Sequence, residues 1–185
     1  MTEHYFGQLD LPLSAEGIIQ CDNLQAFFKE MPLDKIYSSS LKRCLHTTEI
    51  LLGDRKKTVV VEEGFKEINM GVWEGLPFHI IKELYPDEYE KRGQKIETYK
   101  PIGGESFDQL KQRVLPILHN IIRESNVNPG LIVTHAGVIR VILGEILGLS
   151  INEMFKWSVP FAGIIELDRI KANKWVCNMS GCLCK

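Results

Sequence analysis

The chain has 185 residues, of which 44% are apolar and 25% charged, and its formal net charge is −2. A chain of this length can bury a core, and we expect a single domain over residues 1–185. The charge gives no sign of binding to nucleic acid or to a membrane surface, and no apolar stretch approaches the ~20 residues that span a bilayer. The start of the chain has no secretion signal, so we expect a cytoplasmic protein with reduced cysteines. The Cys182-x-Cys184 tail has no matching ligand pair elsewhere, so we expect no metal site.

Apolar periodicity, capping residues and glycines define the elements of the first half. We expect a loop over 1–13, a helix from Ser14 to about Glu30, a strand over 34–37, a helix over 41–52 and a buried strand over 58–62. An irregular segment over 64–75 follows. Residues 77–100 hold one or two short polar helices, interrupted by Pro86 and Gly93, and we expect them to form a small helical cap.

The second half continues the alternation of strands and helices. Ser106 is expected to cap a helix that runs to about Ser125, with Pro116 inside it. A strand over 130–134 leads into a helix that ends near Gly148, and two closing strands over 163–168 and 174–177 are expected to pair as a hairpin. This order predicts a three-layer α/β/α fold, in which helices flank a mostly parallel sheet.

Two strand-to-helix junctions carry residues suited to an anion. His135 follows the strand over 130–134, and Arg43 lies in the first turn of the helix over 41–52. Ligands of open α/β sheets bind beyond the carboxyl ends of the strands, and a helix N-terminus offers free N–H groups to a phosphate. An arginine there can donate two parallel hydrogen bonds to phosphoryl oxygens. The alternatives are a histidine bonded to a neighbouring carbonyl and a solvated surface arginine.

Three carboxyl groups lie in or near glycine-rich turns. Glu67 belongs to an aromatic, glycine-containing segment, which over a cleft can desolvate the carboxyl, raise its pKa and make it a proton donor. An ordinary loop salt bridge is the alternative. Glu74 is expected to be structural and to bond the backbone of the turn. Glu105 precedes a helix, and we expect it either to orient an active-site residue or only to interact with the helix dipole.

Four separated motifs resemble, in their order along the chain, those of the histidine phosphatase (phosphoglycerate mutase-like) superfamily. They are Asp10-Leu11-Pro12-Leu13-Ser14, Ser38-Ser39-Ser40-Leu41-Lys42-Arg43, Glu67 with Gly71-Val72-Trp73-Glu74-Gly75, and Thr134-His135-Ala136-Gly137 after Gly104-Glu105-Ser106. The resemblance implies Arg43 and His135 as phosphate-binding residues, His135 and Glu67 in catalysis with Glu67 as general acid, and Ser39 and Glu105 in supporting positions. It also implies transfer of a phosphoryl group to a histidine nucleophile and then to water, without a metal or an organic cofactor.

One part of the family pattern is absent. The nucleophile of the family stands in an Arg-His-Gly motif at the end of the first, central strand of the sheet, and residues 1–185 contain no Arg-His-Gly. His4 has no preceding strand and no following glycine, so we expect a surface histidine. The chain as written should be nearly inert. We favour an N-terminal truncation, because Arg43, Glu67 and His135 are present; a pseudoenzyme that binds phosphate esters without cleaving them is the alternative.

The substrate is suggested by two further resemblances. The short span between Glu67 and His135 resembles that of small phosphatases, since glycolytic mutases usually carry a longer insertion there. Tyr5-Phe6-Gly7-Gln8-Leu9-Asp10 resembles a loop of the α-ribazole phosphatases of cobalamin biosynthesis. The resemblance implies a small-molecule phosphate ester, with α-ribazole 5′-phosphate as the best match, and leaves mutase-type transfer and a homodimer open. The aromatic residues of the cap suit a ring-bearing substrate or, equally, a packed lid.

Overall fold

The computed structural model describes residues 4–124, 129–171 and 174–180. Its helices are α1 Ala15–Lys29, α2 Lys42–Leu52, α3 Phe78–Leu84, α4 Pro86–Gln94, α5 Phe107–Glu124, α6 Ala136–Leu147 and α7 Ile151–Met154. Its strands are β1 Ile36–Ser39, β2 Val59–Glu62, β3 Leu131–Val133, β4 Ile164–Lys171 and β5 Lys174–Ser180. Two short 3₁₀ turns, Glu63–Phe65 and Gly71–Trp73, fall in the segment that was expected to be irregular. Among the described residues, no helix is both long and apolar enough to cross a membrane.

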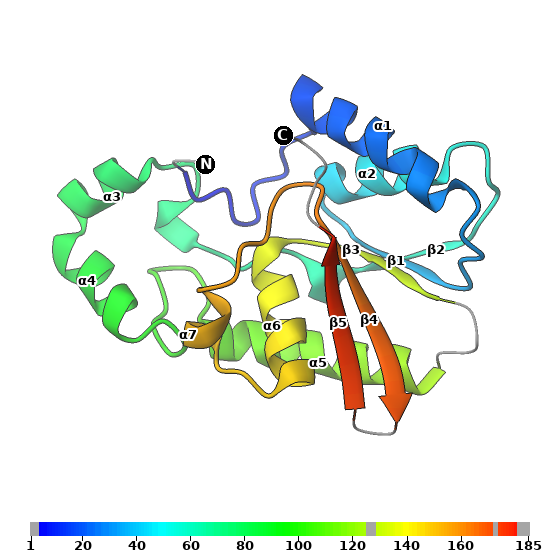
Figure 1. The fold of residues 1–185 in the computed structure, drawn as a ribbon. Coiled ribbons are helices and arrows are strands. Elements are labelled where there is room, and N and C mark those ends of the chain that lie inside the picture. Colours follow the sequence, from blue (N-terminus) through cyan, green and yellow to red (C-terminus); the bar gives the residue numbers. More distant parts are fainter. Residues whose placement is uncertain (1–3, 125–128, 172–173, 181–185) are drawn as a thin grey trace.

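Three parallel strands form the main sheet, in the order β2-β1-β3. Ile36 of β1 pairs with Val59 on one side and with Leu131 on the other. All four residues of β1 are buried, as expected for a central strand in a parallel sheet that helices cover on both faces. Figure 1 shows α1 and α2 above the sheet and α5 and α6 below it. The predicted α/β fold, with helices flanking a parallel sheet, is therefore confirmed.

The closing strands form a separate sheet. β4 and β5 pair antiparallel, from Ile164 opposite Ser180 to Lys171 opposite Lys174, so the predicted hairpin is present and is longer than expected. Within the described ranges, β3 pairs only with β1, and β4 pairs only with β5. Ile164 nevertheless packs against the core cluster that contains Val133, so the hairpin begins close to β3. This division of the sheet agrees with the expectation that the family's central strand is not among these residues.

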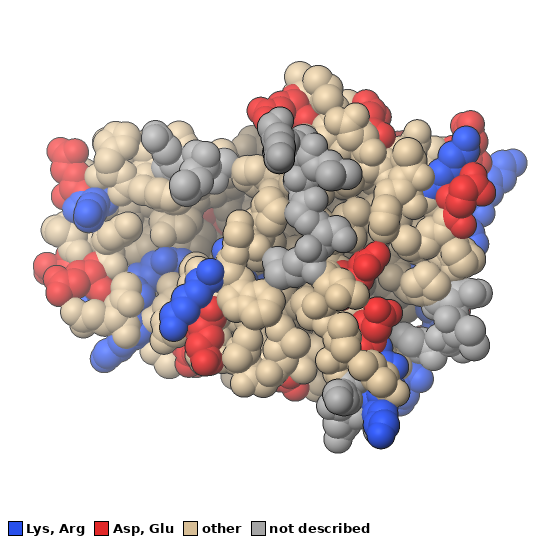
Figure 2. Space-filling view, in the orientation of Figure 1, with Lys and Arg blue, Asp and Glu red and all other residues tan. Residues whose placement is uncertain are grey.

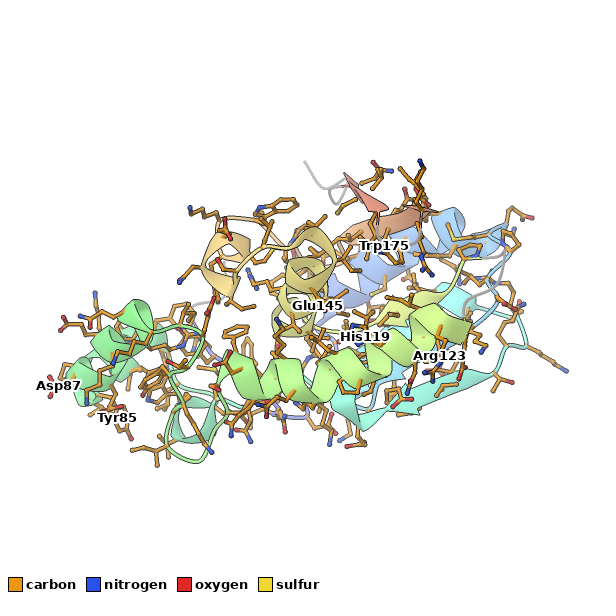
Figure 3. The ribbon with its side chains drawn as sticks, turned by 90° about the horizontal axis from the view of Figure 1, so that it is seen from below. Tyr85, Asp87, His119, Arg123, Glu145 and Trp175 are labelled. Carbon is orange, nitrogen blue, oxygen red and sulfur yellow. The ribbon has the colours of Figure 1, made fainter. Side chains whose placement is uncertain are left out.

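Two helices begin where their capping serines predict, whereas the expected end of the second of them, near Ser125, lies outside the described residues. Ser14 Oγ accepts the Gly17 N–H at 3.1 Å and starts α1. Ser106 and Gln109 exchange backbone-to-side-chain hydrogen bonds of 3.1 and 3.2 Å at the start of α5, which runs through Pro116. Helix α5 extends beneath the sheet from the cap towards the hairpin, with His119 and Arg123 along it (Figure 3).

The cap consists of α3 and α4 and packs around one buried tryptophan. Trp73 is 1% exposed, and its indole contacts the rings of four tyrosines at centroid distances of 5.7–6.5 Å, namely Tyr5, Tyr85, Tyr89 and Tyr99. This packing favours the interpretation of the cap as a packed lid. It does not favour the alternative, in which the aromatic side chains bind a ring of the substrate. The Tyr5 N–H donates to the Leu76 carbonyl at 3.4 Å, and the Gly75 N–H donates to the Tyr5 carbonyl at 2.7 Å. These bonds join the N-terminal loop, residues 4–13, to the segment that leads into the cap, and the Tyr5 ring packs on Phe78 of α3 at a centroid distance of 4.5 Å.

Two predicted details are wrong. The strand expected to be buried over 58–62 is β2, and its Val60 and Val61 are 40% and 50% exposed, because β2 is an edge strand of the sheet. Gly93 does not interrupt the cap helices but lies inside α4, where its surroundings are open. Cys21, Cys44 and Cys177 are free thiols, whereas Cys182 and Cys184 lie outside the described residues.

Candidate active site

Two strand ends and two helix starts meet at one edge of the sheet. Ser38 of β1 pairs in parallel with Val133 of β3, so the residues that follow both strands emerge together. Ser39 ends β1, Arg43 lies in the first turn of α2, and His135 is the N-cap residue of α6. The structure therefore brings these three predicted residues together from two distant parts of the chain.

The imidazole of His135 is buried, and both of its ring nitrogens are bonded. Arg43 Nε, which can only donate, lies 3.3 Å from His135 Nδ1, so Nδ1 accepts and the ring proton is assigned to Nε2. Nε2 then donates to Ser39 Oγ at 2.8 Å. Burial, together with the charges of Arg43 and Arg113, lowers the pKa of His135 to about 3. The ring is therefore neutral at pH 7, and it orients the Arg43 guanidinium without adding a charge.

The N-terminal loop holds the other end of Arg43. Arg43 Nη1 donates to the Leu9 carbonyl at 2.7 Å, and Nη2 donates to the Gly7 carbonyl at 2.8 Å. Asp10 accepts the backbone N–H of Lys42 at 2.7 Å, which joins the same loop to the start of α2. These contacts use three of the five guanidinium N–H groups, so two remain for the oxygens of an anion. Sequence analysis missed the two carbonyl acceptors, because backbone acceptors leave no signal in residue types.

The Glu67 carboxyl lies at the N-terminus of α6. Its Oε1 accepts the N–H groups of Ile68 at 2.8 Å and of Gly137 at 3.1 Å, while Oε2 lies 3.2 Å from the Gly137 nitrogen. Burial raises the pKa of Glu67, although these hydrogen bonds and the charges of Arg43 and Arg140 act in the opposite direction. Oε2 makes the weaker contact and is the oxygen better placed to carry a proton. A carboxyl with a raised pKa beside an anion pocket can protonate a leaving oxygen.

Glu105 acts on the Glu67 segment through a second arginine. Arg113 donates to both oxygens of Glu105, at 2.9 and 3.0 Å, and the same guanidinium donates to the carbonyls of Gly64 at 2.6 Å and of Glu67 at 2.9 Å. Glu105 also accepts the N–H of Asn69 at 3.1 Å. These contacts fix the backbone on either side of the Glu67 side chain, so Glu105 is placed to orient Glu67 rather than only to interact with a helix dipole.

Glu74 bonds the backbone, as expected for a structural residue. Its Oε1 accepts the N–H of Gln8 at 2.8 Å and that of Met70 at 3.1 Å. The Gln8 side chain donates in turn to the Glu67 carbonyl at 3.0 Å. The N-terminal loop therefore contacts the Glu67 segment as well as Arg43.

Two further arginines, of which Arg140 was not predicted as a site residue, lie near these groups. Figure 2 shows a hollow between the cap and the body of the protein, with Lys and Arg atoms along its lower wall. Arg92 of α4 lies 5.1 Å from the centroid of the Tyr5 ring, and Arg140 of α6 lies 4.7 Å from that of Phe155. Burial lowers the pKa of Arg140, and the charge of Arg92 adds to this effect. In the sequence, the position of Arg140 one helical turn after Gly137 is the feature that could have indicated its place near the site.

Gly137→Ala is expected to lower the free energy of unfolding by about 1–3 kcal/mol. An added Cβ would collide with Glu67 Oε1, so the carboxyl would have to move off the Gly137 N–H. Urea unfolding measures the change. Gly93→Ala is the matched control, because nothing lies within 4 Å of its Cβ position and alanine is the better helix former. Equal losses in both variants would contradict the close approach of Glu67 to α6.

Comparison with known proteins gives one family. The model of the histidine phosphatase superfamily (branch 1) matches residues 1–181. The 6-phosphofructo-2-kinase/fructose-2,6-bisphosphatase 3 of Rattus norvegicus is 31% identical over 163 residues, which cover 87% of this chain and 28% of that protein. The chain therefore spans less than one third of the length of that relative.

Two further relatives are similar over more of their length. The adenosylcobalamin/α-ribazole phosphatase of Escherichia coli (strain K12) is 26% identical over 155 residues, which cover 84% of this chain and 76% of that protein. The crystal structure of the α-ribazole phosphatase from Shigella flexneri matches with a TM-score of 0.86 at 24% identity, over 96% of this chain and 88% of that one. At that identity the structural match shows the fold alone.

Proposed function

The chain belongs to the histidine phosphatase superfamily, and we propose that its site serves the hydrolysis of a small-molecule phosphomonoester through a phosphohistidine. The favoured substrate is α-ribazole 5′-phosphate. The similarity to the adenosylcobalamin/α-ribazole phosphatase over 76% of that protein supports this choice, as does the resemblance of residues 5–10 to the loop of such enzymes.

One observation carries the proposal: a guanidinium, a neutral imidazole and a carboxyl with a raised pKa lie at the same edge of the sheet. Arg43 has two N–H groups left for phosphoryl oxygens, and His135 fixes its orientation. Glu67 supplies a proton donor beside them. This combination fits a transferring phosphoryl group, whose charge needs cationic donors and whose leaving oxygen needs a proton.

The reaction then proceeds in two steps. A nucleophilic histidine attacks phosphorus and forms an N–P bond, while the ester O–P bond breaks and the leaving oxygen takes the proton of Glu67. The Glu67 carboxylate next removes a proton from water, which attacks the phosphohistidine and releases inorganic phosphate. Arg43 bonds the phosphoryl oxygens throughout both steps.

Residues 1–185 contain no Arg-His-Gly, and we propose that the nucleophile is supplied from outside them. We propose that an additional strand supplies it by pairing with β3 and β4, as in an N-terminally longer form of the protein. The separate sheets support this placement, since β3 and β4 each have one strand neighbour among the described residues. A strand parallel to β3 would end beside His135, where the phosphoryl group is bound.

A sugar bisphosphate is the second candidate substrate. The relative of highest identity reported above is a 6-phosphofructo-2-kinase/fructose-2,6-bisphosphatase, and Arg92 brings an additional cation to the cap side of the site. Comparison of phosphate release from fructose 2,6-bisphosphate and from α-ribazole 5′-phosphate distinguishes the two substrates.

The fate of the phosphate tests the function. The protein used carries an added strand that ends in Arg-His-Gly. Release of inorganic phosphate from α-ribazole 5′-phosphate supports hydrolysis, whereas recovery of the phosphate at a second position of a phosphoglycerate supports mutase-type transfer. Stabilisation of the protein by phosphate esters without turnover supports the non-catalytic binder.

Arg43→Ala is expected to abolish the stabilisation of residues 1–185 by inorganic phosphate or orthovanadate. An anion at a hundred times its Kd adds about 2.7 kcal/mol to the free energy of unfolding, and Arg43 provides the donors for it. Thermal unfolding with and without the anion measures the effect. The control is Lys42→Ala, because the Lys42 side chain is 67% exposed and bridges to Asp10 at the protein surface. An anion effect that survives in Arg43→Ala would place the binding site elsewhere.

A further inference from the structure

A buried donor beside the proposed site has no acceptor. Nε of Arg140 is buried and makes no hydrogen bond with the described residues. The guanidinium instead lies over the ring of Phe155, with its carbon 4.7 Å from the ring centroid. Buried polar groups are almost always hydrogen-bonded, and a charged donor without a partner is especially unfavourable. Arg140 is therefore placed for an acceptor that is not bonded to it in this state.

Glu67 is the carboxyl that faces Arg140. Residues three positions apart share a face of a helix, so Arg140 lies one turn along α6 from Gly137, whose N–H bonds Glu67. A side chain at position 137 would collide with Glu67, so the carboxyl covers this face of α6. Burial lowers the pKa of Arg140, and the charge of Glu67 raises it.

We propose that Arg140 is a positioning residue that receives the Glu67 carboxylate once that group has given up its proton. The guanidinium shifts from Phe155 towards Glu67, and its free Nε–H donates to the Oε2 that carried the proton. The inference rests on the proposed function, in which Glu67 alternates between carboxylic acid and carboxylate. In this role Arg140 acts on the reaction through Glu67.

Other charged and titratable groups face this pair from each neighbouring element. Arg43 of α2 also lowers the pKa of Glu67, and Arg92 of α4 opposes the charge of Arg140. Arg113 of α5 bonds the Glu67 carbonyl. The Cys44 thiol of α2 stays neutral, because burial raises its pKa to about 12. Removal of Arg140 therefore leaves Arg43 as a remaining cation, and the effect on Glu67 is partial.

The test is a titration of the Glu67 carboxyl by ¹³C NMR in residues 1–185, with Glu67→Gln to assign the signal. In Arg140→Met the pKa of Glu67 is expected to rise by about one unit, a tenfold change in proton affinity. Arg140→Lys keeps the charge and is expected to restore most of the difference. The matched control is Arg92→Met, which removes a guanidinium of α4, and this variant is expected to leave the pKa of Glu67 within a few tenths of a unit. An unchanged Glu67 pKa in folded Arg140→Met would overturn the inference.

A second readout needs no change at Arg140. The ¹⁵N–¹H signal of Arg140 Nε in the wild-type chain is expected to move with the same midpoint as the Glu67 titration and to stay fixed in Glu67→Gln. An Arg140 Nε chemical shift that does not change as Glu67 titrates would overturn the inference, even if Arg140→Met did not fold. Both titrations are independent of turnover. An extended protein without hydrolysis would therefore count against the proposed function and not against this pairing.

Discussion

Addition of a β-strand that ends in Arg-His-Gly ahead of residue 1 is expected to raise phosphomonoester hydrolysis by about 10⁴–10⁶-fold over residues 1–185 alone. The added strand can pair with the free edges of β3 and β4, which would bring its histidine beside Arg43 and His135. Removal of a nucleophile from an enzyme lowers turnover by that factor, so its return should restore a similar factor. Release of inorganic phosphate, and its inhibition by vanadate, measure the gain.

Two controls separate chemistry from a general improvement in folding. The same extension with its histidine replaced by asparagine can pair with both sheets but should return activity to the level of residues 1–185. Glu67→Gln in the extended protein should lower turnover by about 10²–10⁴-fold for substrates with poorly acidic leaving groups, since it removes the proton donor. A well-folded extended protein that hydrolyses no phosphomonoester of a broad panel would contradict the proposed function.

Acidification from pH 6.5 to pH 3 is expected to remove about 4 kcal/mol from the free energy of unfolding through His135 alone. Burial and the charges of Arg43 and Arg113 lower the pKa of His135 from its usual 6.5 to about 3. Between these values the unfolded chain binds a proton that the folded chain does not, so stability falls with falling pH by up to about 1.4 kcal/mol per unit. From about one pH unit above 6.5 the imidazole is neutral in both states, and this contribution to the pH dependence disappears.

The contribution of His135 is isolated by difference, because carboxyl groups titrate over the same range. Urea unfolding at intervals from pH 7 to pH 4 should show a flatter profile for His135→Gln than for the wild type. His119→Gln is the control, since His119 lies on the exposed side of α5, 57% accessible and 3.5 Å from Glu145 (Figure 3). Parallel profiles for the wild type and His135→Gln would show that the buried ring protonates without penalty.

The convergence of Arg43 and His135 could be predicted from the sequence, because each follows a strand directly and parallel strands end at the same edge of a sheet. The helix starts at Ser14 and Ser106 were also predictable, since their side chains cap the backbone locally. At the two caps the deciding contact lies within three residues of the capping serine. Arg43 and His135 are distant in the chain, and it is the parallel order of their strands that brings them together.

Features that depend on distant contacts were not predictable. The exposure of Val60 depends on which strand lies at the edge of the sheet, and the same apolar run would suit a central strand. The carbonyls of Gly7 and Leu9 bind Arg43 across more than 30 residues through backbone atoms, whose role no residue type reveals. The position of Arg140 was not predictable as part of the site, because the lack of a hydrogen-bond partner for its Nε among the described residues is a property of the packed structure.

The N-terminal loop has a thermodynamic consequence. The Tyr5 ring contacts Phe78 and Arg92 of the cap, while Gly7 and Leu9 are hydrogen-bonded to Arg43, so one short segment connects the lid to the guanidinium. Where an anion binds more tightly with the lid closed, reciprocity requires the anion to favour closure by the same factor. Affinity for phosphate then becomes an allosteric property, which surface substitutions in α3 or α4 can tune without touching the ligand.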